Sequence, residues 1–307
     1  MRSAPVDPRA GRAAKERLDA RRAQVPDDVS AWWVDPGTHQ TVVAVVGPAT
    51  AAARAFAADD DPTAVRLQPM SAPVRPLTGP PSTSSWLAGP MGERRRPDVG
   101  RQQRAVAGGA EPLDAGSLVG GTAITTTGTR CSDGFSVRRG STTYLLTAGH
   151  CTAEGTTWNG PDRRRIGTVE RTAYPGDDYG LIRVADTAAW RGSGRVQGGP
   201  TVTGTTEAPN GSRICRSGST SGYHCGVVQA TDVTVNYGTG TVIAGLTRTT
   251  VCADPGDSGG PFVTPDSAQA QGTLSGGSGD CVAGGTTYFE PLGPVLASAG
   301  LTLVTGD

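Results

Sequence analysis

The sequence lacks the features that mark several common classes of binding and membrane protein. Its formal net charge is +0, so no overall basic field attracts nucleic acid or an anionic membrane, and we expect neither as a partner. No apolar run approaches the roughly 18 residues of a membrane helix. Only 5% of the residues are aromatic whereas 45 are glycine, which is typical of a turn-rich β-protein.

The chain also begins without the apolar segment that directs secretion, since Met1–Pro5 leads into a polar stretch. The six cysteines are Cys131, Cys151, Cys215, Cys225, Cys252 and Cys281. An even number confined to one region indicates disulfides that form in an oxidising compartment. We therefore expect a secreted, extracellular protein whose signal peptide is not in this sequence.

A metal site is the competing interpretation of the cysteines. It is disfavoured because no Cys-x-x-Cys pair exists and the only histidines are His39, His150 and His224. We therefore expect neither a metal nor a cofactor. The sequence leaves the disulfide connectivity open, and our hypothesis is that neighbours pair. The pairs would be Cys131–Cys151, Cys215–Cys225 and Cys252–Cys281.

Composition divides the chain into three parts. Residues 1–70 combine helical patterns with a strand–turn–strand pattern over Ala31–Gly47, which predicts a small α+β unit. Residues 71–116 are rich in Pro, Gly, Ser and Arg without periodicity, which predicts a linker. Over residues 117–307, short β-branched runs alternate with Gly-rich turns. That pattern predicts an all-β sandwich or barrel, with a helix near its end at Pro291–Ala299.

The strongest motif surrounds Ser258, between Gly256 and Gly260. Glycines on both sides allow a tight turn and leave the serine unhindered. The N–H groups of Gly256 and Ser258 can then point into one pocket, as an oxyanion hole requires. A Gly-Ser surface turn is the alternative interpretation. Serine needs a base, and His150 follows an apolar strand next to Cys151, although a structural histidine would also fit there.

A catalytic histidine needs a carboxylate that fixes its tautomer. Asp178 lies where a polar turn enters an apolar strand, and we prefer it to Asp177, which we assign to the turn. The order His150, Asp178, Ser258 is that of chymotrypsin-type enzymes. An α/β-hydrolase needs a histidine after the serine, and none follows Ser258. Subtilisin-type enzymes have the aspartate before the histidine on an α/β background, which this sequence does not support.

These motifs, with Ile214–Gly226, Val235–Gly238 and Leu274–Cys281, resemble bacterial chymotrypsin-like serine proteases of the streptogrisin and α-lytic protease type, in peptidase family S1. The resemblance covers Leu118–Gly306, with the motifs in the right order. It implies two six-stranded antiparallel β-barrels with the triad in the cleft between them and a C-terminal helix. It also supports the pairing of neighbouring cysteines.

The first 70 residues resemble the pro-region of that family in Trp32–Asp35 and Thr41–Val46. Such pro-regions assist folding of the protease and inhibit it until they are removed. The resemblance therefore implies that this chain's own pro-region, shortened at its N-terminus, is its intramolecular chaperone and inhibitor. We expect processing near residues 105–118, a mature start around Asp114–Ser117, and a monomer.

The resemblance also assigns substrate-binding roles. Ser275 would hydrogen-bond near Asp178. Ser275, Gly276 and Gly277 would pair with the substrate backbone as an added strand. Tyr237 would line the pocket for the residue before the cleaved one.

The pocket for the cleaved residue itself follows from the same resemblance. Trypsin-like enzymes keep an aspartate six positions before the serine, and Cys252 stands there in this chain. Ala253 and Leu274 would instead form an apolar pocket, which predicts a preference for medium-to-large apolar side chains. Asp254 is an alternative that would favour basic substrates, although we assign it to a solvated pocket rim.

Arg216 would form a buried ion pair with Asp257, a task for which animal enzymes use a newly formed N-terminal amine. The chain would then need no such activation trigger. We expect a secreted serine endopeptidase that acts on protein or peptide substrates and is made as a self-processing precursor. Two alternatives stay open: a non-catalytic binding protein on the same fold, and a precursor that its pro-region keeps latent.

Overall fold

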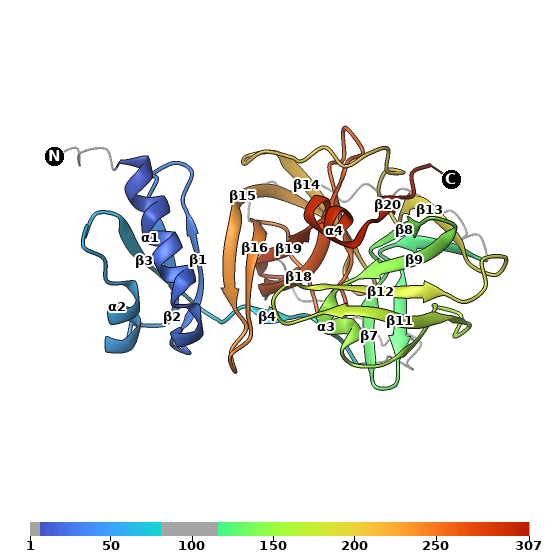
Figure 1. The fold of residues 1–307 in the computed structure, drawn as a ribbon, viewed down its shortest axis with the longest axis horizontal. Helices are drawn as coiled ribbons and strands as arrows, with labels where there is room; N and C mark the ends of the chain where they lie inside the picture. Colours follow the sequence, from blue (N-terminus) through green and yellow to red (C-terminus); the bar gives the residue numbers. More distant parts are fainter. Residues whose placement is uncertain (1–6, 81–115, 307) are drawn as a thin grey trace, which may run out of the picture.

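The computed structural model describes residues 7–80 and 116–306. Residues 7–80 form an N-terminal unit, which lies beside a larger β-domain of residues 116–306 (Figure 1). Within these described ranges, no helix is long and apolar enough to cross a membrane.

Six strands in the second half of the β-domain form a closed ring. Their order is β14-β17-β18-β19-β16-β15, and β14 also pairs with β15. This ring has the six strands that the resemblance implies for a barrel. Its strands are β14 (Arg213–Gly218), β15 (Gly222–Asn236), β16 (Val242–Thr249), β17 (Pro261–Val263), β18 (Ala270–Asp280) and β19 (Gly284–Pro291).

The first half of the β-domain is an eight-stranded sheet in the order β20-β8-β9-β12-β11-β10-β6-β7. It exceeds the expected six strands partly because the end of the chain returns as β20 and pairs with β8. These strands are β6 (Ala123–Thr126), β7 (Thr129–Ser132), β8 (Phe135–Arg139), β9 (Thr142–Thr147), β10 (Thr157–Asn159), β11 (Arg165–Ala173), β12 (Tyr179–Val184) and β20 (Thr302–Leu303). A separate parallel pair consists of β5 (Ser117–Gly120) and β13 (Arg191–Val196).

The N-terminal unit packs helices on one face of a three-stranded sheet. Its elements are α1 (Pro8–Ala20), the short 3-10 helix Arg22–Gln24, β1 (Val29–Val34), β2 (Thr41–Val46), α2 (Ala51–Ala57), β3 (Val65–Met70) and β4 (Arg75–Pro76). Strand β1 pairs antiparallel with β15, so the sheet of the unit continues the ring of the β-domain. The unit is therefore bound through backbone hydrogen bonds as well as side chains.

Two adjacent tryptophans illustrate how β1 joins the two parts. Successive side chains on a strand point to opposite faces. Trp32 packs into the core of the N-terminal unit, with its ring 5.4 Å from that of Phe56. Trp33 packs on the other face, in one apolar cluster with Val233 and Leu246 of the β-domain. The strand thus belongs to two cores at once.

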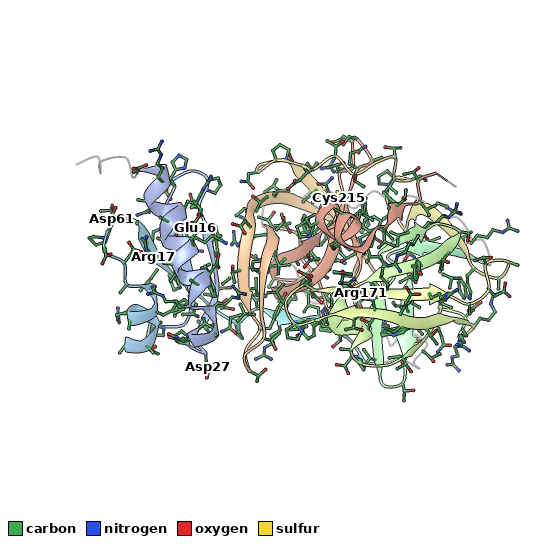
Figure 2. All side chains as sticks on the ribbon, viewed as in Figure 1. Glu16, Arg17, Asp27, Asp61, Arg171 and Cys215 are labelled. Atoms are coloured by element: carbon green, nitrogen blue, oxygen red, sulfur yellow. A yellow bond between two sulfur atoms is a disulfide. The ribbon has the colours of Figure 1, made fainter. Side chains whose placement is uncertain are left out.

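A buried lysine adds a polar contact between the two parts. Lys15, the only lysine in the chain, is 3% exposed and forms ion pairs with Asp19 (2.7 Å) and with Asp232 of the β-domain (3.0 Å). The neighbouring side chains of Glu16 and Arg17 are exposed on the outer face of α1 (Figure 2). Helix α1 therefore turns one face to the core and the other to solvent.

Local sequence signals set the ends of the helices. Asp7 accepts a hydrogen bond from the Arg9 N–H at the start of α1, and Thr50 accepts one from Ala53 at the start of α2. Helix α4 (Leu292–Ala299) ends at Gly300, whose φ of 62° lies in the left-handed region that glycine adopts readily. Helix α4 occupies the stretch in which the sequence predicts a helix.

Candidate active site

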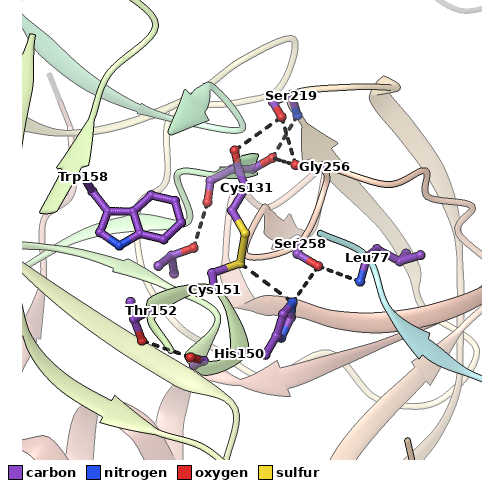
Figure 3. Close-up of a disulfide and its surroundings, with 12 residues drawn as sticks. Leu77, Cys131, His150, Cys151, Thr152, Trp158, Ser219, Gly256 and Ser258 are labelled. Atoms are coloured by element: carbon purple, nitrogen blue, oxygen red, sulfur yellow. Dashed lines mark hydrogen bonds between the residues drawn. A yellow bond between two sulfur atoms is a disulfide. The ribbon is translucent and has the colours of Figure 1, made fainter. Parts of the chain in front are cut away.

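His150 lies on α3 (Gly149–Thr152), a single helical turn that follows β9. The disulfide Cys131–Cys151 ties this turn to β7, directly beside the histidine (Figure 3). Gly149 leaves room for close packing, since a Cβ there would lie 2.5 Å from the carbonyl oxygen of Ala173. The disulfide on one side of His150 and the close packing of Gly149 on the other therefore hold the imidazole in place.

His150, Asp178 and Ser258 meet in one hydrogen-bonded line. The Nδ1 atom of His150 lies 2.9 Å from Oδ2 of Asp178. On the other side of the imidazole, Nε2 lies 2.8 Å from Oγ of Ser258 (Figure 3). The His150 backbone N–H also donates to Asp178 Oδ1 at 2.8 Å. A carboxylate in this position holds the imidazole with Nε2 free to accept the serine proton. Asp177, the rival in the sequence, is exposed.

Asp178 is fully buried, and its carboxylate has a further partner. The hydroxyl of Ser275 donates to Asp178 Oδ2 at 2.5 Å, and the hydroxyl of Tyr237 lies 2.7 Å from that of Ser275. Burial raises the pKa of Tyr237 well above its usual range, with the Asp178 charge adding to the effect. Tyr237 therefore stays a neutral phenol that supports the Ser275 hydroxyl.

Glu290 is a residue of the site that sequence reasoning missed. It lies in β19, and its Oε2 accepts a hydrogen bond from the backbone N–H of Asp178 at 3.1 Å. Burial raises the pKa of Glu290 to about 8, the negative charge of Asp178 adds to the rise, and the N–H contact opposes it. No local motif marks this glutamate, because only the packing of β19 behind the Asp178 turn brings the two together.

Replacing Glu290 with glutamine is expected to flatten the pH dependence of stability. The folded pKa of about 8 lies above the ordinary value of 4.5, so the folded chain binds more protons between these values. The stabilisation that the protonated Glu290 carboxyl provides is complete below a pH of about 4.5, and it is lost as the pH rises through about 8. We expect wild type to lose about 5 kcal/mol of unfolding free energy over this range relative to Glu290→Gln.

Denaturant unfolding at several pH values measures this difference, with all variants built on Ser258→Ala to prevent self-digestion. Glu154→Gln, at an exposed position, is the matched control and should keep the wild-type pH profile. Parallel profiles for Glu290→Gln and wild type would contradict the prediction.

Ser258 lies in a turn that two glycines make possible. Gly256 has φ 105° and Gly259 has φ 82°, both in the left-handed region. A Cβ at Gly256 would lie 2.4 Å from Thr220 Oγ1, and one at Gly259 would lie 2.0 Å from Thr147 Oγ1. A side chain at either position would therefore clash with these neighbours and displace the turn that carries Ser258.

The same turn rests on the ion pair between Arg216 and Asp257. Both side chains are fully buried, with Arg216 Nη2 3.3 Å from Asp257 Oδ2. Asp257 also accepts backbone N–H bonds from Thr220 (2.8 Å), Ser221 (3.1 Å) and Asp254 (2.8 Å). The two residues for which the resemblance implies an ion pair therefore lie in contact. The carboxylate next to Ser258 is held by charge and by four main-chain or hydroxyl donors, the fourth being Ser221 Oγ.

A stretch of the N-terminal unit lies beside Ser258. Strand β4 pairs antiparallel with β18, with Pro76 opposite Gly276 and Arg75 opposite Gly277. These two glycines were predicted to pair with substrate. A Cβ at Gly276 would lie 2.5 Å from the Arg75 carbonyl oxygen, so the close approach needs glycine. Strand β4 begins inside the segment for which composition alone predicts a linker.

Leu77 follows β4 and lies next to Ser258. Its N–H donates to Ser258 Oγ at 2.9 Å, and its carbonyl oxygen accepts from the N–H groups of Gly256 (2.5 Å) and Ser258 (3.4 Å). These are the two groups that the sequence predicts for an oxyanion hole. A peptide carbonyl therefore lies where negative charge would develop during attack by the serine.

The side chain of Leu77 packs in an apolar cluster. The same cluster contains Ala253 and Leu274, which the resemblance assigns to the pocket for the cleaved residue. The sequence missed five further members of the cluster, which are Ile214, Val228, Val251, Phe262 and Phe289. Asp254 lies nearby without a basic partner among the described hydrogen bonds, accepting instead from the Cys281 N–H at 3.4 Å.

The cysteines form three disulfides between neighbours: Cys131–Cys151, Cys215–Cys225 and Cys252–Cys281. His224 lies near the third of them. That group provides no thiolate for a metal, because both sulfurs belong to the disulfide. The imidazole of His224 instead contacts the Ser221 carbonyl oxygen at 2.8 Å.

The β-rich fold and this arrangement of side chains define the class of the β-domain, which is a chymotrypsin-like serine protease fold. Residues 118–295 match the family described as Trypsin, and residues 12–61 match the Alpha-lytic protease prodomain. The chain belongs to the trypsin family, with an α-lytic protease type prodomain ahead of the protease domain. From here on, the N-terminal unit is called the pro-region.

The sequence and the fold of this chain are similar to those of known serine proteases. Streptogrisin-C of Streptomyces griseus is 47% identical over 200 residues, which is 64% of this chain and 43% of that protein. Serine protease 1 of Streptomyces fradiae is 33% identical over 99% of this chain and 91% of its own length. The solved structure of Thermobifida fusca Protease A is 47% identical with a TM-score of 0.55, covering 62% of this chain and all of that one. The chain spans about half the length of the first curated relatives it matches.

Proposed function

We propose that this chain is the precursor of a secreted serine endopeptidase that cleaves after medium-to-large apolar residues. The observation that carries the proposal is a peptide carbonyl, that of Leu77, held by the Gly256 and Ser258 N–H groups beside the hydrogen-bonded Ser258 and His150. The three disulfides support folding in an oxidising compartment. We propose that the processed enzyme acts as a monomer.

In the proposed reaction, Ser258 Oγ attacks the carbonyl carbon of the substrate while His150 Nε2 accepts its proton. The carbonyl oxygen becomes an oxyanion that the N–H groups of Gly256 and Ser258 stabilise. His150 then donates its proton to the leaving nitrogen, and water repeats the sequence on the acyl-enzyme. Asp178 keeps the imidazole oriented and stabilises its charged form.

The extended substrate would bind as Arg75 and Pro76 do, by adding a strand to β18 at Gly276 and Gly277. The residue before the scissile bond would enter the pocket that Leu77 fills. Ala253 and Leu274 supply apolar walls there, in the cluster that they share with Leu77. Burial of a charged substrate side chain against these walls would be strongly unfavourable.

A cleavage profile tests this proposal. The full chain is expressed into an oxidising compartment and the processed product is given a mixed peptide library, with the Ser258→Ala chain as the blank. We expect cleavage after Leu, Phe and Met to exceed cleavage after Arg, Lys or Glu by at least about 100-fold in kcat/KM, because an unpaired charge must be buried for the latter. A profile dominated by Arg, Lys or Glu would contradict the proposed specificity.

One observation also favours a latent state of the precursor. Residues 75–79 fill the cleft, and the pro-region is also held to the β-domain by β1 on β15. We therefore propose that the precursor is latent while its pro-region stays bound. In this state the pro-region acts as an intramolecular inhibitor, and the pairing of β1 with β15 supports a role in folding the six-stranded ring of the β-domain.

A further inference from the structure

The segment in the cleft continues past the catalytic serine to the far side. Gly79 exchanges both backbone hydrogen bonds with Arg130, N–H to O at 3.0 Å and O to N–H at 2.8 Å. A Cβ at Gly79 would lie 3.0 Å from the Gly256 backbone, so this approach favours glycine. The chain is therefore held as an extended strand on both sides of the peptide bond between Leu77 and Thr78.

Contacts on both sides of this peptide bond distinguish an uncleaved substrate from a cleaved product. A product that ends at the pocket needs contacts only on the side of Arg75, Pro76 and Leu77. Here the carbonyl of Leu77 accepts from the oxyanion-hole N–H groups, while the chain after Thr78 is fixed by two more hydrogen bonds at Gly79. Holding reacting groups in place on both sides of the bond is the arrangement that favours reaction.

Contacts further from this peptide bond also hold the segment in place. Val74 is buried in the cluster that joins the pro-region to the six-stranded ring of the β-domain, together with Trp33 and Tyr288. Its backbone N–H donates to Ser30 Oγ of the pro-region at 2.9 Å. The strand is thus tied at one end to the folded pro-region and at the other to β7 of the protease domain, with Leu77 between them.

We propose that the Leu77–Thr78 peptide bond is a processing site that this chain cleaves with its own Ser258. The proposal rests on the proposed function, because it uses the same active site. It places a cut well before Leu118, where the match to the protease family begins. It is additional to the processing that the sequence predicts near residues 105–118, so the stretch between the two sites would be released as a separate piece.

The reaction consumes one water for this cut. Ser258 Oγ bonds to the Leu77 carbonyl carbon and its proton passes to His150 Nε2. The bond between that carbon and the Thr78 nitrogen breaks as the proton moves from His150 to the nitrogen, which becomes the amine of a new N-terminus. Water then adds to the ester, its proton returning through His150 to Ser258 Oγ, and Leu77 becomes a C-terminal carboxylate.

Terminal analysis of the chain during processing tests this proposal. The full chain is purified from an oxidising compartment, and its fragments are followed by intact mass and N-terminal sequencing at two protein concentrations. We expect one fragment that ends at Leu77 and one that begins at Thr78. Their rate of appearance should be first order and independent of concentration, and the Ser258→Ala chain should stay uncut at this bond.

Two substitutions at one position sharpen the test. Leu77→Asp places a charge in the apolar pocket and is expected to slow this cut by at least about 100-fold, whereas Leu77→Met should keep the rate within about tenfold. A serine-directed phosphonate is applied to every sample once processing has stopped. Since wild-type fragment ends decide the question on their own, the proposal stays testable even where Leu77→Asp fails to fold.

The outcomes separate this proposal from the proposed function. A chain that labels with the phosphonate and processes elsewhere, but keeps Leu77–Thr78 intact, overturns the processing site and leaves the protease. A cut at this bond in the Ser258→Ala chain, made by another protease, also overturns it. A chain that neither labels nor processes itself overturns the proposed function.

Discussion

The Ser258→Ala variant is expected to lose about 10⁶-fold in kcat on an apolar peptide, because the nucleophile and its base act as one unit. Ser258 Oγ lies 2.8 Å from His150 Nε2, within reach of the proton transfer that the reaction needs. His150→Ala should lose about as much, and the double variant no more than either alone. Initial rates on a chromogenic peptide with Leu before the scissile bond measure all three.

A matched control separates chemistry from folding in this experiment. Ser267 is an exposed serine in the turn between β17 and β18, and Ser267→Ala should leave kcat within about twofold of wild type. Circular dichroism and a free-thiol count show whether each variant has folded and formed its disulfides. A folded Ser258→Ala chain that keeps more than about one hundredth of the wild-type kcat would contradict the assignment of the nucleophile.

The Arg216→Met variant is expected to lose about 3–5 kcal/mol of unfolding free energy. Methionine fills a similar space but leaves the Asp257 carboxylate buried without its cation. Burial already lowers the pKa of Arg216, against the opposing effect of the Asp257 charge, which indicates how fully the pair is desolvated. Because Asp257 is adjacent to Ser258, we also expect a lower kcat in any variant that still folds.

Two further variants serve as controls for Arg216→Met. Arg164→Met removes an arginine from an exposed ion pair with Asp162 and should change stability by less than about 1 kcal/mol. Arg216→Met/Asp257→Asn removes the stranded charge and should recover part of the loss. Denaturant unfolding in the Ser258→Ala background gives all values. A loss below about 1 kcal/mol for Arg216→Met would show that the ion pair does not support the turn.

The sequence was most informative where chemistry needs a fixed residue type at a fixed local geometry. Ser258 between glycines, His150 after an apolar strand and Asp178 at a turn are each marked by their immediate neighbours, and their order along the chain selects the fold. The structure brings these three within hydrogen-bonding distance. Arg216 and Asp257 were placed only through a family resemblance, since nothing local pairs them.

Residues that depend on distant packing were not predictable from local pattern. Glu290 contacts Asp178 because β19 passes behind the turn, and Lys15 contacts Asp232 across the boundary of the pro-region. Residues 71–80 have the composition of a linker because a strand that adds to an existing sheet needs little propensity of its own. Leu77 therefore gave no local signal, although it fills the pocket.

Strand β15 shows a different limit of sequence patterns. Two apolar runs, Cys225–Gln229 and Val233–Tyr237, predict two short strands separated by polar residues. They form one strand of 15 residues, Gly222–Asn236. Register shifts along it and a φ of 52° at Asp232 absorb the polar interruption as bulges. The last part of this long strand provides the edge against which β1 of the pro-region pairs.

The most direct test of the central claim is covalent labelling of the processed chain with a phosphonate that carries an apolar side chain. Peptide mapping by mass spectrometry then locates the adduct. We expect one adduct per chain, on Ser258, with none on Ser258→Ala and a strongly reduced rate on His150→Ala. A folded, processed chain that carries no adduct, or carries it on another residue, would contradict the assignment of Ser258 as the nucleophile of a serine endopeptidase.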